Sequence, residues 1–288
     1  EHGAIHIAGG SIGGNANLTA DSKGTDSGNI IIGYNSNDPN VVTDKNSTSI
    51  KGNIKAKSNL WTKAYSEGDL KFVGSDIAQK ITAESKNGNV VFANSVAGSA
   101  DLTAGQNALS SNSTINEDLT MKATNQAIIN KSKIGNDLTV NAGKIYVNAS
   151  NSPITDLTEV GGNFTANSQK NVSVYNMTVG EKATLKSGLT KQTPGHEKTS
   201  PTYLSNFKAK NLDVESGDNV SIINGSEIAE TAKVVAGKDD PNMENATTHK
   251  KNAMFFMENS KVGKTLDVET EHGAIHIAGG SIGGNANL

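Results

Sequence analysis

The sequence predicts an all-β protein, a right-handed parallel β-helix (β-solenoid), and three observations support this prediction. Apolar residues recur every 19 residues, the strands that they define alternate apolar with polar positions, and Gly, Asn, Ser and Asp punctuate the strands. No stretch keeps the i, i+3, i+4, i+7 spacing of an amphipathic helix over three turns. Short strands repeated in this way bury their apolar face only by stacking each unit on the next.

The repeating unit has apolar residues at positions 0, +4 and +6, usually with a small residue at +1, as in Ile134, Leu138 and Val140. A second apolar pair follows in each unit, such as Val90 and Phe92. We therefore expect about 11 coils in each 270-residue period, with a basic coil of 19 residues and loop insertions. Position 0 of these units is expected at Ile12, Ile50, Ile77, Val96, Ile115, Ile134, Val160, Val179, Phe207, Ile228 and Val262.

Residues 1–18 return letter for letter as residues 271–288, a distance of 270 residues. This duplication predicts one full period of a longer tandem array plus an 18-residue overlap, so residues 1–288 are expected to form a single continuous β-helix segment. With about 4.8 Å between paired strands, eleven coils advance roughly 53 Å per period.

Some coils are longer than 19 residues, and the excess is expected to leave the helix as loops because the apolar frame resumes on either side. Prolines, which would remove a ladder hydrogen bond, all fall within these expected loops. The insertions are predicted at about 57–68, 186–203 and 237–252 after first strands, and at 33–48 and 148–157 after second strands.

Composition excludes several classes of function. The chain has no Cys, so neither disulfides nor thiolate chemistry contribute. All 26 basic residues are Lys and the net charge is −3, so no basic patch for nucleic acid is evident. No apolar run approaches the length of a membrane span, so membrane insertion is not expected.

Position −2 of the units is mostly Ser or Thr, and parity places it on the inner side of a corner. We interpret this row as an internal hydroxyl stack that bonds to turn backbone, because a catalytic serine would not be repeated in most coils. The glycines at +1, such as Gly135 and Gly180, are interpreted as turn residues. The row reads Gly10, Thr48, Ser75, Asn94, Ser113, Ser132, Thr158, Met177, Ser205, Ser226 and Ser260.

The outward row at +5 is rich in Thr, but charged residues interrupt it, so β-propensity explains it better than an ice-binding face. Scattered histidines such as His2 and His6, and the acidic pair at 239–240, lack the spacing of a metal site. We therefore expect no catalytic, cofactor-binding or metal-binding residue. The +5 row reads Asn17, Lys55, Thr82, Asp101, Thr120, Thr139, Thr165, Thr184, Lys233 and Asp267.

Eleven Asn-x-Ser/Thr sequons occur in a chain rich in these residues, so most matches are compositional. By their expected places on a corner and a loop, Asn176 and Asn245 are predicted to be more accessible than the sequons within strands.

The unit S-x-[IV]-G-x-[ND]-[LF]-T-[VA], seen in 132–140 and partly in 158–166, resembles the repeats of filamentous haemagglutinin-like exoproteins. These are large bacterial adhesins of two-partner secretion, and the shafts of contact-dependent inhibition toxins look similar. The resemblance covers essentially the whole chain. It implies a secreted protein on a bacterial cell surface, exported through an outer-membrane transporter.

Two functions follow as expectations. The first is a structural and adhesive segment of a long fibre, with the next copies of the repeat as partners and binding loops that contact surface receptors or glycans. The second is a passive stalk of a contact-dependent inhibition toxin or of another tip-bearing exoprotein. A β-helix enzyme acting on polysaccharides is least expected, because such enzymes need clustered carboxylates and a basic residue, and this chain has no Arg.

Overall fold

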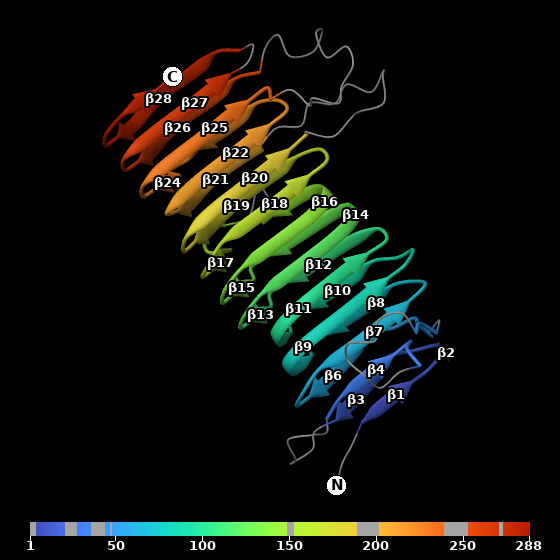
Figure 1. Ribbon diagram of the computed structural model, residues 1–288. Coiled ribbons are helices and arrows are strands. Elements are labelled where there is room, and N and C mark those ends of the chain that lie inside the picture. The colour runs from blue at the N-terminus through green and yellow to red at the C-terminus, as the bar shows by residue number, and fades with distance from the viewer. Residues whose placement is uncertain are drawn as a thin grey trace, which may run out of the picture. The chain divides into compact units, whose positions relative to one another are not determined.

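The computed structural model describes residues 4–20, 28–35, 44–46, 48–148, 153–188, 202–238, 253–270 and 273–288. These residues form β-strands joined by turns, and no helix occurs among them. Neighbouring strands pair in parallel, coil upon coil, which confirms the parallel β-helix (Figure 1). The chain divides into two compact units, residues 1–136 and 137–288, each of which is described by itself.

The first unit contains fifteen of the named strands. They are β1 (Ile5–Ile7), β2 (Gly10–Ile12), β3 (Ala16–Ala20), β4 (Ile30–Ile32), β5 (Thr48–Ile50), β6 (Ile54–Ser58), β7 (Thr62–Ser66), β8 (Leu70–Val73), β9 (Asp76–Ser85), β10 (Val90–Ala93), β11 (Val96–Ala104), β12 (Asn107–Ser111), β13 (Thr114–Ile115), β14 (Leu119–Asn130) and β15 (Lys133–Ile134).

The second unit contains the remaining fourteen. They are β16 (Leu138–Val147), β17 (Thr158–Val160), β18 (Phe164–Ser168), β19 (Val172–Val179), β20 (Lys182–Ser187), β21 (Thr202–Ala209), β22 (Asn211–Ser216), β23 (Val220–Ile223), β24 (Glu227–Ile228), β25 (Thr231–Ala236), β26 (Phe255–Val262), β27 (Thr265–Thr270), β28 (Ile275–Ile282) and β29 (Ala286–Asn287).

Three parallel ladders form the sides of each regular coil. The first-strand ladder carries positions +4 and +6, and in the first unit it joins the later parts of β9 and β11 to the start of β14. The second-strand ladder carries the second apolar pair and runs through β8, β10, β12 and the end of β14. The corner ladder carries position 0 and joins the starts of β9 and β11 to β13 and β15.

The side chains that point inward from these ladders form the core. Ile81, Phe92 and Leu119 are fully buried, as are their partners along each ladder. Burial of such a side chain contributes about 1.5–3 kcal/mol, so a thin column of aliphatic residues is enough to hold each coil on the next.

In the second unit the same three ladders recur. First strands stack from β16 through β18, β20, β22, β25 and β27 to β29. Second strands stack from the end of β16 through β19, β21, β23 and β26 to β28. The second copy of the duplicated segment follows the predicted frame, because Ile282 pairs with Val262 and Ala286 with Leu266.

Two predicted core positions are wrong by one or two residues. Ala97, not Val96, pairs with Ile77 and Ile115, and a register shift follows it; Val96 is 41% exposed. The coil from Ile77 to Ala97 is one residue longer than 19, and the coil from Ala97 to Ile115 is one residue shorter. The register shift is a β-bulge that accommodates this difference in length.

In the second unit, Phe207 pairs with Met177 at position −2, and position 0 belongs to Ala209, which pairs with Ile228. Both Phe207 and Ala209 are buried, so the sequence offers two apolar candidates for one corner and only the register separates them.

The predicted insertion at 57–68 is wrong, because it contains strand β7. Thr62 pairs with Ile30 of β4 and with Ile81 of β9, so β7 occupies the first-strand ladder. Strand β6 is displaced onto the second-strand and corner ladders, where Ile54 pairs with Phe72 and Ser58 with Ile77. The ladders therefore shift by one strand at this coil.

This shift places the two copies of the duplicated segment differently. In the first unit, Ile5 pairs with Ile30, and their ladder continues through β7 into the first strands. In the second unit, Ile275 pairs with Phe255 in the second-strand ladder. Identical residues thus occupy two different ladders.

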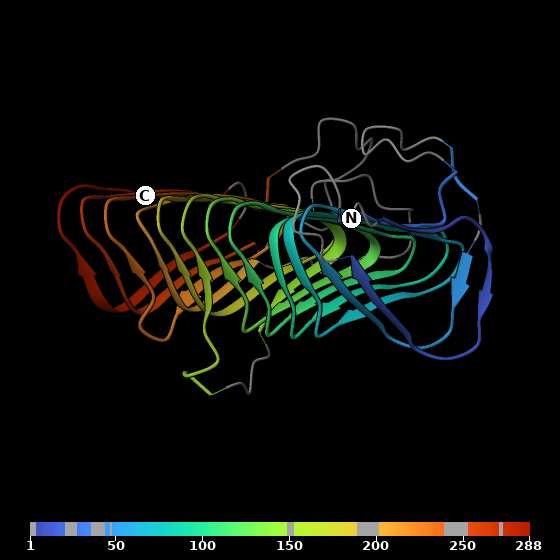
Figure 2. The same ribbon diagram turned by 90° about the horizontal axis from the view of Figure 1, so that it is seen from below.

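The other four predicted insertions lie partly outside the described residues. Of the insertion at 148–157, residues 153–157 contain no strand and project from the second unit (Figure 2), with Ile154 76% exposed. This part agrees with the predicted loop.

Candidate functional site

The predicted hydroxyl stack at the corner is confirmed. Ser113 donates through Oγ to the carbonyl oxygens of Ser111 (2.9 Å) and Phe92 (3.2 Å), and Ser260 to those of Glu258 (2.8 Å) and Ile222 (3.3 Å). These hydroxyls satisfy backbone carbonyls where the chain turns, which is a structural role.

Two members of the stack were wrongly placed. Ser95, 2% exposed, occupies the place predicted for Asn94, and Phe207 the place predicted for Ser205. Both corrections follow from the shifted positions 0 at Ala97 and Ala209.

The residue before the corner serine adopts a left-handed backbone in successive coils, which the sequence reasoning did not locate. Asn94, Asn112 and Asn259 have φ between 46° and 50°, a region that Asn tolerates better than most residues. The amides of Asn94 and Asn112 stack, since Asn112 Nδ2 donates to Asn94 Oδ1 at 2.7 Å. The signal was present, because Asn-Ser recurs at these corners.

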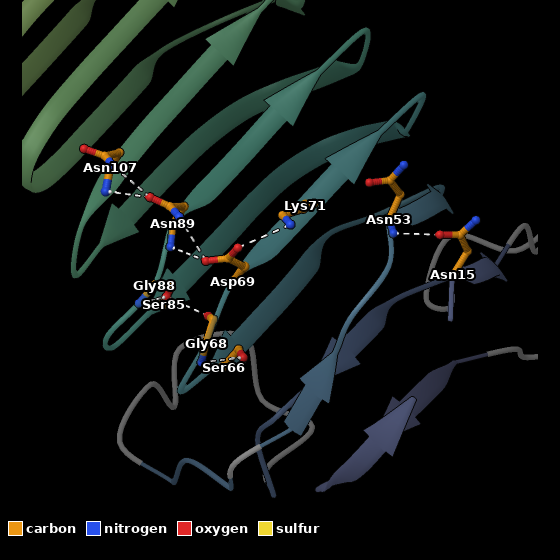
Figure 3. Close-up of polar contacts among 10 residues, drawn as sticks. All are labelled: Asn15, Asn53, Ser66, Gly68, Asp69, Lys71, Ser85, Gly88, Asn89 and Asn107. Carbon is orange, nitrogen blue, oxygen red and sulfur yellow. Dashed lines mark hydrogen bonds and ion pairs between the residues drawn. The ribbon is translucent and has the colours of Figure 1, made fainter. Parts of the chain in front are cut away.

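A second polar stack lies at the entry to the second-strand ladder of the first unit (Figure 3). Asp69 Oδ1 accepts from the backbone N of Asn89 (2.9 Å) and from its Nδ2 (3.0 Å), and Asn89 Oδ1 accepts the same pair of bonds from Asn107. The backbone bond from Asn89 holds the pKa of the Asp69 carboxyl below its usual value. The stack fixes the geometry of the turn. The Asp69 carboxylate is engaged by Asn89 and by Lys71.

At Gly135, Gly180 and Gly263, glycine at +1 is required by close approach of the neighbouring coil. A Cβ on Gly135 would lie 1.9 Å from the carbonyl oxygen of Asn116, and one on Gly180 would lie 2.1 Å from that of Gly161. Neither Gly135 nor Gly180 has a positive φ, so the prediction of a turn residue holds for a different physical reason.

The outward +5 row mixes Thr with charged residues, as predicted. Asp101 pairs with Thr82 and Thr120 in the first unit. Lys55 pairs with Asn17, its predicted neighbour in this row, but Lys63 pairs with Thr82 where Lys55 was expected. In the second unit Thr139, Thr165 and Thr184 follow one another in this row, and Asp213 ends the run.

Charged side chains on the first-strand face of the second unit form ion pairs from coil to coil. Lys182 contacts Asp213 at 2.5 Å, and Glu215 contacts Lys186 (3.1 Å) and Lys238 (2.7 Å). The hydrogen bond from Lys238 holds the pKa of Glu215 below its usual value. These groups are solvated, so each pair contributes only about 0–1 kcal/mol.

The second-strand face of the same unit is different, because aromatic side chains alternate with serine along one outward row. Tyr146 pairs with Ser173, and Ser173 with Tyr203. The register continues Tyr203–Ser221, Ser221–Phe256 and Phe256–His276. We call Tyr146, Tyr203, Phe256 and His276, together with Tyr175 from the adjacent outward row, the aromatic row.

Two pairs of these rings are in contact. Tyr175, one row aside, lies 5.3 Å from Tyr203 between ring centroids, and Phe256 lies 5.6 Å from His276. Burial raises the pKa of Tyr175 and of Tyr203, so both phenols stay neutral at physiological pH. Their side chains are only partly buried, which leaves part of each ring open to solvent.

In the first unit the outward residues of β4 and β7, on the first-strand face, are covered. Ile31, Tyr34, Trp61, Lys63 and Tyr65 form an outer cluster against this face. Lys63 is 1% exposed, and its Nζ lies 4.2 Å from the centroid of the Tyr34 ring. A cation over a tyrosine face is attracted by the ring quadrupole, so the cluster anchors β7 from outside the core.

The histidines that the structure describes lie apart. His6 donates to the carbonyl oxygen of Tyr34, and His276 lies 3.9 Å from Glu258. In the described part of the chain, no group of three or more His, Asp or Glu side chains is placed to hold a metal ion. His2, His196, His249, His272 and the acidic pair at 239–240 lie outside the described residues. No described helix has the length and apolar character needed to cross a membrane.

The prediction for the sequons is wrong at Asn176. This side chain is 6% exposed, and its Nδ2 donates to the carbonyl oxygen of Pro153 at 3.1 Å, because Asn176 is one of the left-handed corner residues. Asn245 lies outside the described residues.

Comparison of the chain with family models, with characterised proteins and with solved structures gives no match. The resemblance to filamentous haemagglutinin-like repeats therefore stays a prediction from the residues that carry it.

Proposed function

We propose that this chain is a structural and adhesive repeat segment of a long bacterial cell-surface fibre. The observation that carries the proposal is the letter-for-letter recurrence of residues 1–18 at 271–288 within a stack of parallel coils. The second copy continues the ladders of the coils before it, through Ile282 on Val262 and Ala286 on Leu266. Solenoid coils contact only their neighbours, so a further copy can stack on the preceding coil by the same parallel strand pairing.

In this proposal the partners are the following copies of the same repeat, an outer-membrane transporter during secretion, and receptors or glycans on an opposing surface. The protein acts by reach and contact and catalyses no reaction. Support for this part comes from the structural roles of the polar stacks, since the hydroxyl stack and the Asp69 stack are engaged by backbone and amide groups.

The partly exposed aromatic row favours an adhesive segment over a passive stalk. A stalk needs only soluble outer faces, whereas the second unit carries three tyrosines and a phenylalanine on one face. Aromatic side chains are enriched where proteins bind partners.

The test is to express arrays of one, two and four periods on bacterial cells and to image the fibres by electron microscopy. Fibre length proportional to copy number is expected, with roughly 53 Å added per period if eleven coils are each about 4.8 Å apart. A length independent of copy number, or a compact particle retained inside the cell, would contradict the proposal.

A further inference from the structure

We infer that the aromatic row of the second unit is a binding site for an extended, uncharged saccharide chain lying along the β-helix. The inference deepens the proposed adhesive role and rests on it only for the biological setting. Its physical basis is the side-chain pattern of one face, formed by β16, β19, β21, β23, β26 and β28.

Aromatic rings recur along this face at a regular interval. Along the outward row the residues are Tyr146, Ser173, Tyr203, Ser221 and Phe256, so an aromatic ring recurs at every second coil. With about 4.8 Å between strands, successive rings are roughly 10 Å apart and a small hydroxyl side chain lies between them. A ligand that matches this face must repeat along its own length, offering apolar surfaces to the rings and hydrogen-bonding groups to the serines.

Sugar rings joined by equatorial bonds have this character. Each pyranose ring presents C–H bonds on its two faces and hydroxyl groups around its edge, and a chain of such rings is straight and ribbon-like. Stacking of a ligand on aromatic faces is favourable and tolerant of chemical detail. Hydroxyl and amide side chains such as Ser173, Ser221 and Asn171 can exchange hydrogen bonds with the ring edges.

The two faces of the second unit differ in charge. The first-strand face of the same unit carries Asp213, Glu215 and Lys182 in ion pairs. The aromatic row is flanked on one side by Asn171, Asn219 and Met254, with Lys144 at the start of that flank and Glu258 near the other end of the row. A face with so little charge offers nothing to neutralise the sulfates or carboxylates of an acidic polysaccharide, and it complements an uncharged one.

The rings are also held in place before a ligand arrives. Tyr175 and Tyr203 contact each other at 5.3 Å and each is partly buried, so little rotamer freedom remains to be lost on binding. Preorganised aromatic side chains give affinity at low entropic cost, which suits a repeated site of modest strength.

The test uses the whole chain and three soluble probes: a β-1,4-linked glucose hexamer, a β-1,4-linked N-acetylglucosamine hexamer and a sulfated heparin hexamer. Titration calorimetry and tyrosine fluorescence measure the dissociation constants. At least one uncharged hexamer is expected to bind in the micromolar to millimolar range, with little dependence on salt, and more tightly than the heparin hexamer. Absence of binding by both uncharged hexamers, or tighter binding of heparin, would overturn the inference.

Variants separate binding from packing. Tyr203→Ala should weaken binding about tenfold or more, whereas Tyr203→Phe, which keeps the ring, should bind within about twofold of the parent chain. Thr165→Ala on the first-strand face is the control and should change nothing. If Tyr203→Ala lowers the melting temperature but binds the hexamer as the parent does, the row only packs the sheet. That result would not contradict the proposed fibre, whose length would still depend on the number of copies.

Discussion

Replacement of one inward isoleucine tests whether the corner ladder holds the coils together. Ile134 is 1% exposed and pairs with Ile115, which is fully buried. Ile134→Asp removes a side chain whose burial is worth about 1.5–3 kcal/mol and puts a carboxyl group in its place. Burial of that group without a partner adds about 1–3 kcal/mol even when it takes up a proton. The expected loss is therefore about 4 kcal/mol.

Ile154→Asp is the matched control, because it makes the same chemical change at a side chain that is 76% exposed. It should alter stability by less than about 0.5 kcal/mol. Because long repeat arrays do not always unfold in one step, urea denaturation should be paired with hydrogen exchange at Ile115 and its neighbours. Equal effects of the two substitutions would refute the assignment of Ile134 to the core.

Three further predictions concern the coil contacts, the surface charges and the pH response. Gly135→Ala should destabilise by about 1–3 kcal/mol, since its Cβ would lie 1.9 Å from the Asn116 carbonyl oxygen; Gly13→Ala, whose Cβ would meet nothing within 4 Å, is the control in a thermal melt. Glu215→Gln should cost at most about 1 kcal/mol in low salt and nothing measurable in 1 M salt, and a large salt-independent loss would contradict a solvated ion pair. The pKa of Glu215 is depressed in the folded chain, so its contribution to stability is present above the unfolded pKa and is lost as the pH falls through the folded value. The difference in unfolding free energy between the parent and Glu215→Gln, measured by urea titration, should therefore vanish well below pH 4 and persist at pH 7.

Most of the fold could be predicted because the frame is repeated. Period-2 alternation fixes which face is buried, and the 19-residue interval then aligns Ile81, Ala100 and Leu119 without any knowledge of contacts. The frame failed where two neighbouring residues were both apolar. At Val96 and Ala97 the hydrophobic pattern is ambiguous, and the inward hydroxyl of Ser95 would have resolved it by parity.

Strand β7 could not be predicted from periodicity, because its inward residues are the weakly apolar Thr62 and Ala64. Its outward residues Lys63 and Tyr65 are buried by Tyr34, which is distant in the sequence. Tertiary packing therefore stabilises a strand in a segment whose sequence predicts a loop.

The aromatic row was missed for a related reason. Tyr146, Tyr203 and Phe256 are separated by insertions of different length, so their common row is visible only in the strand register. From the sequence, binding was expected in the loops. On a flat face, residues at irregular sequence spacings lie side by side, so their spacing does not reveal the site.

The duplicated segment has a consequence for how position is specified along the chain. Ile5–Ile7 and Ile275–Ile277 are identical, yet each unit places them in a different ladder. The sequence of this segment therefore does not determine which ladder it joins. Its alternation of apolar and polar residues suits either ladder, and the strand with which it pairs decides between them. The strand register of each coil follows that of the coil on which it stacks, as in templated growth. A feature such as β7 with its outer cluster is needed to change that register.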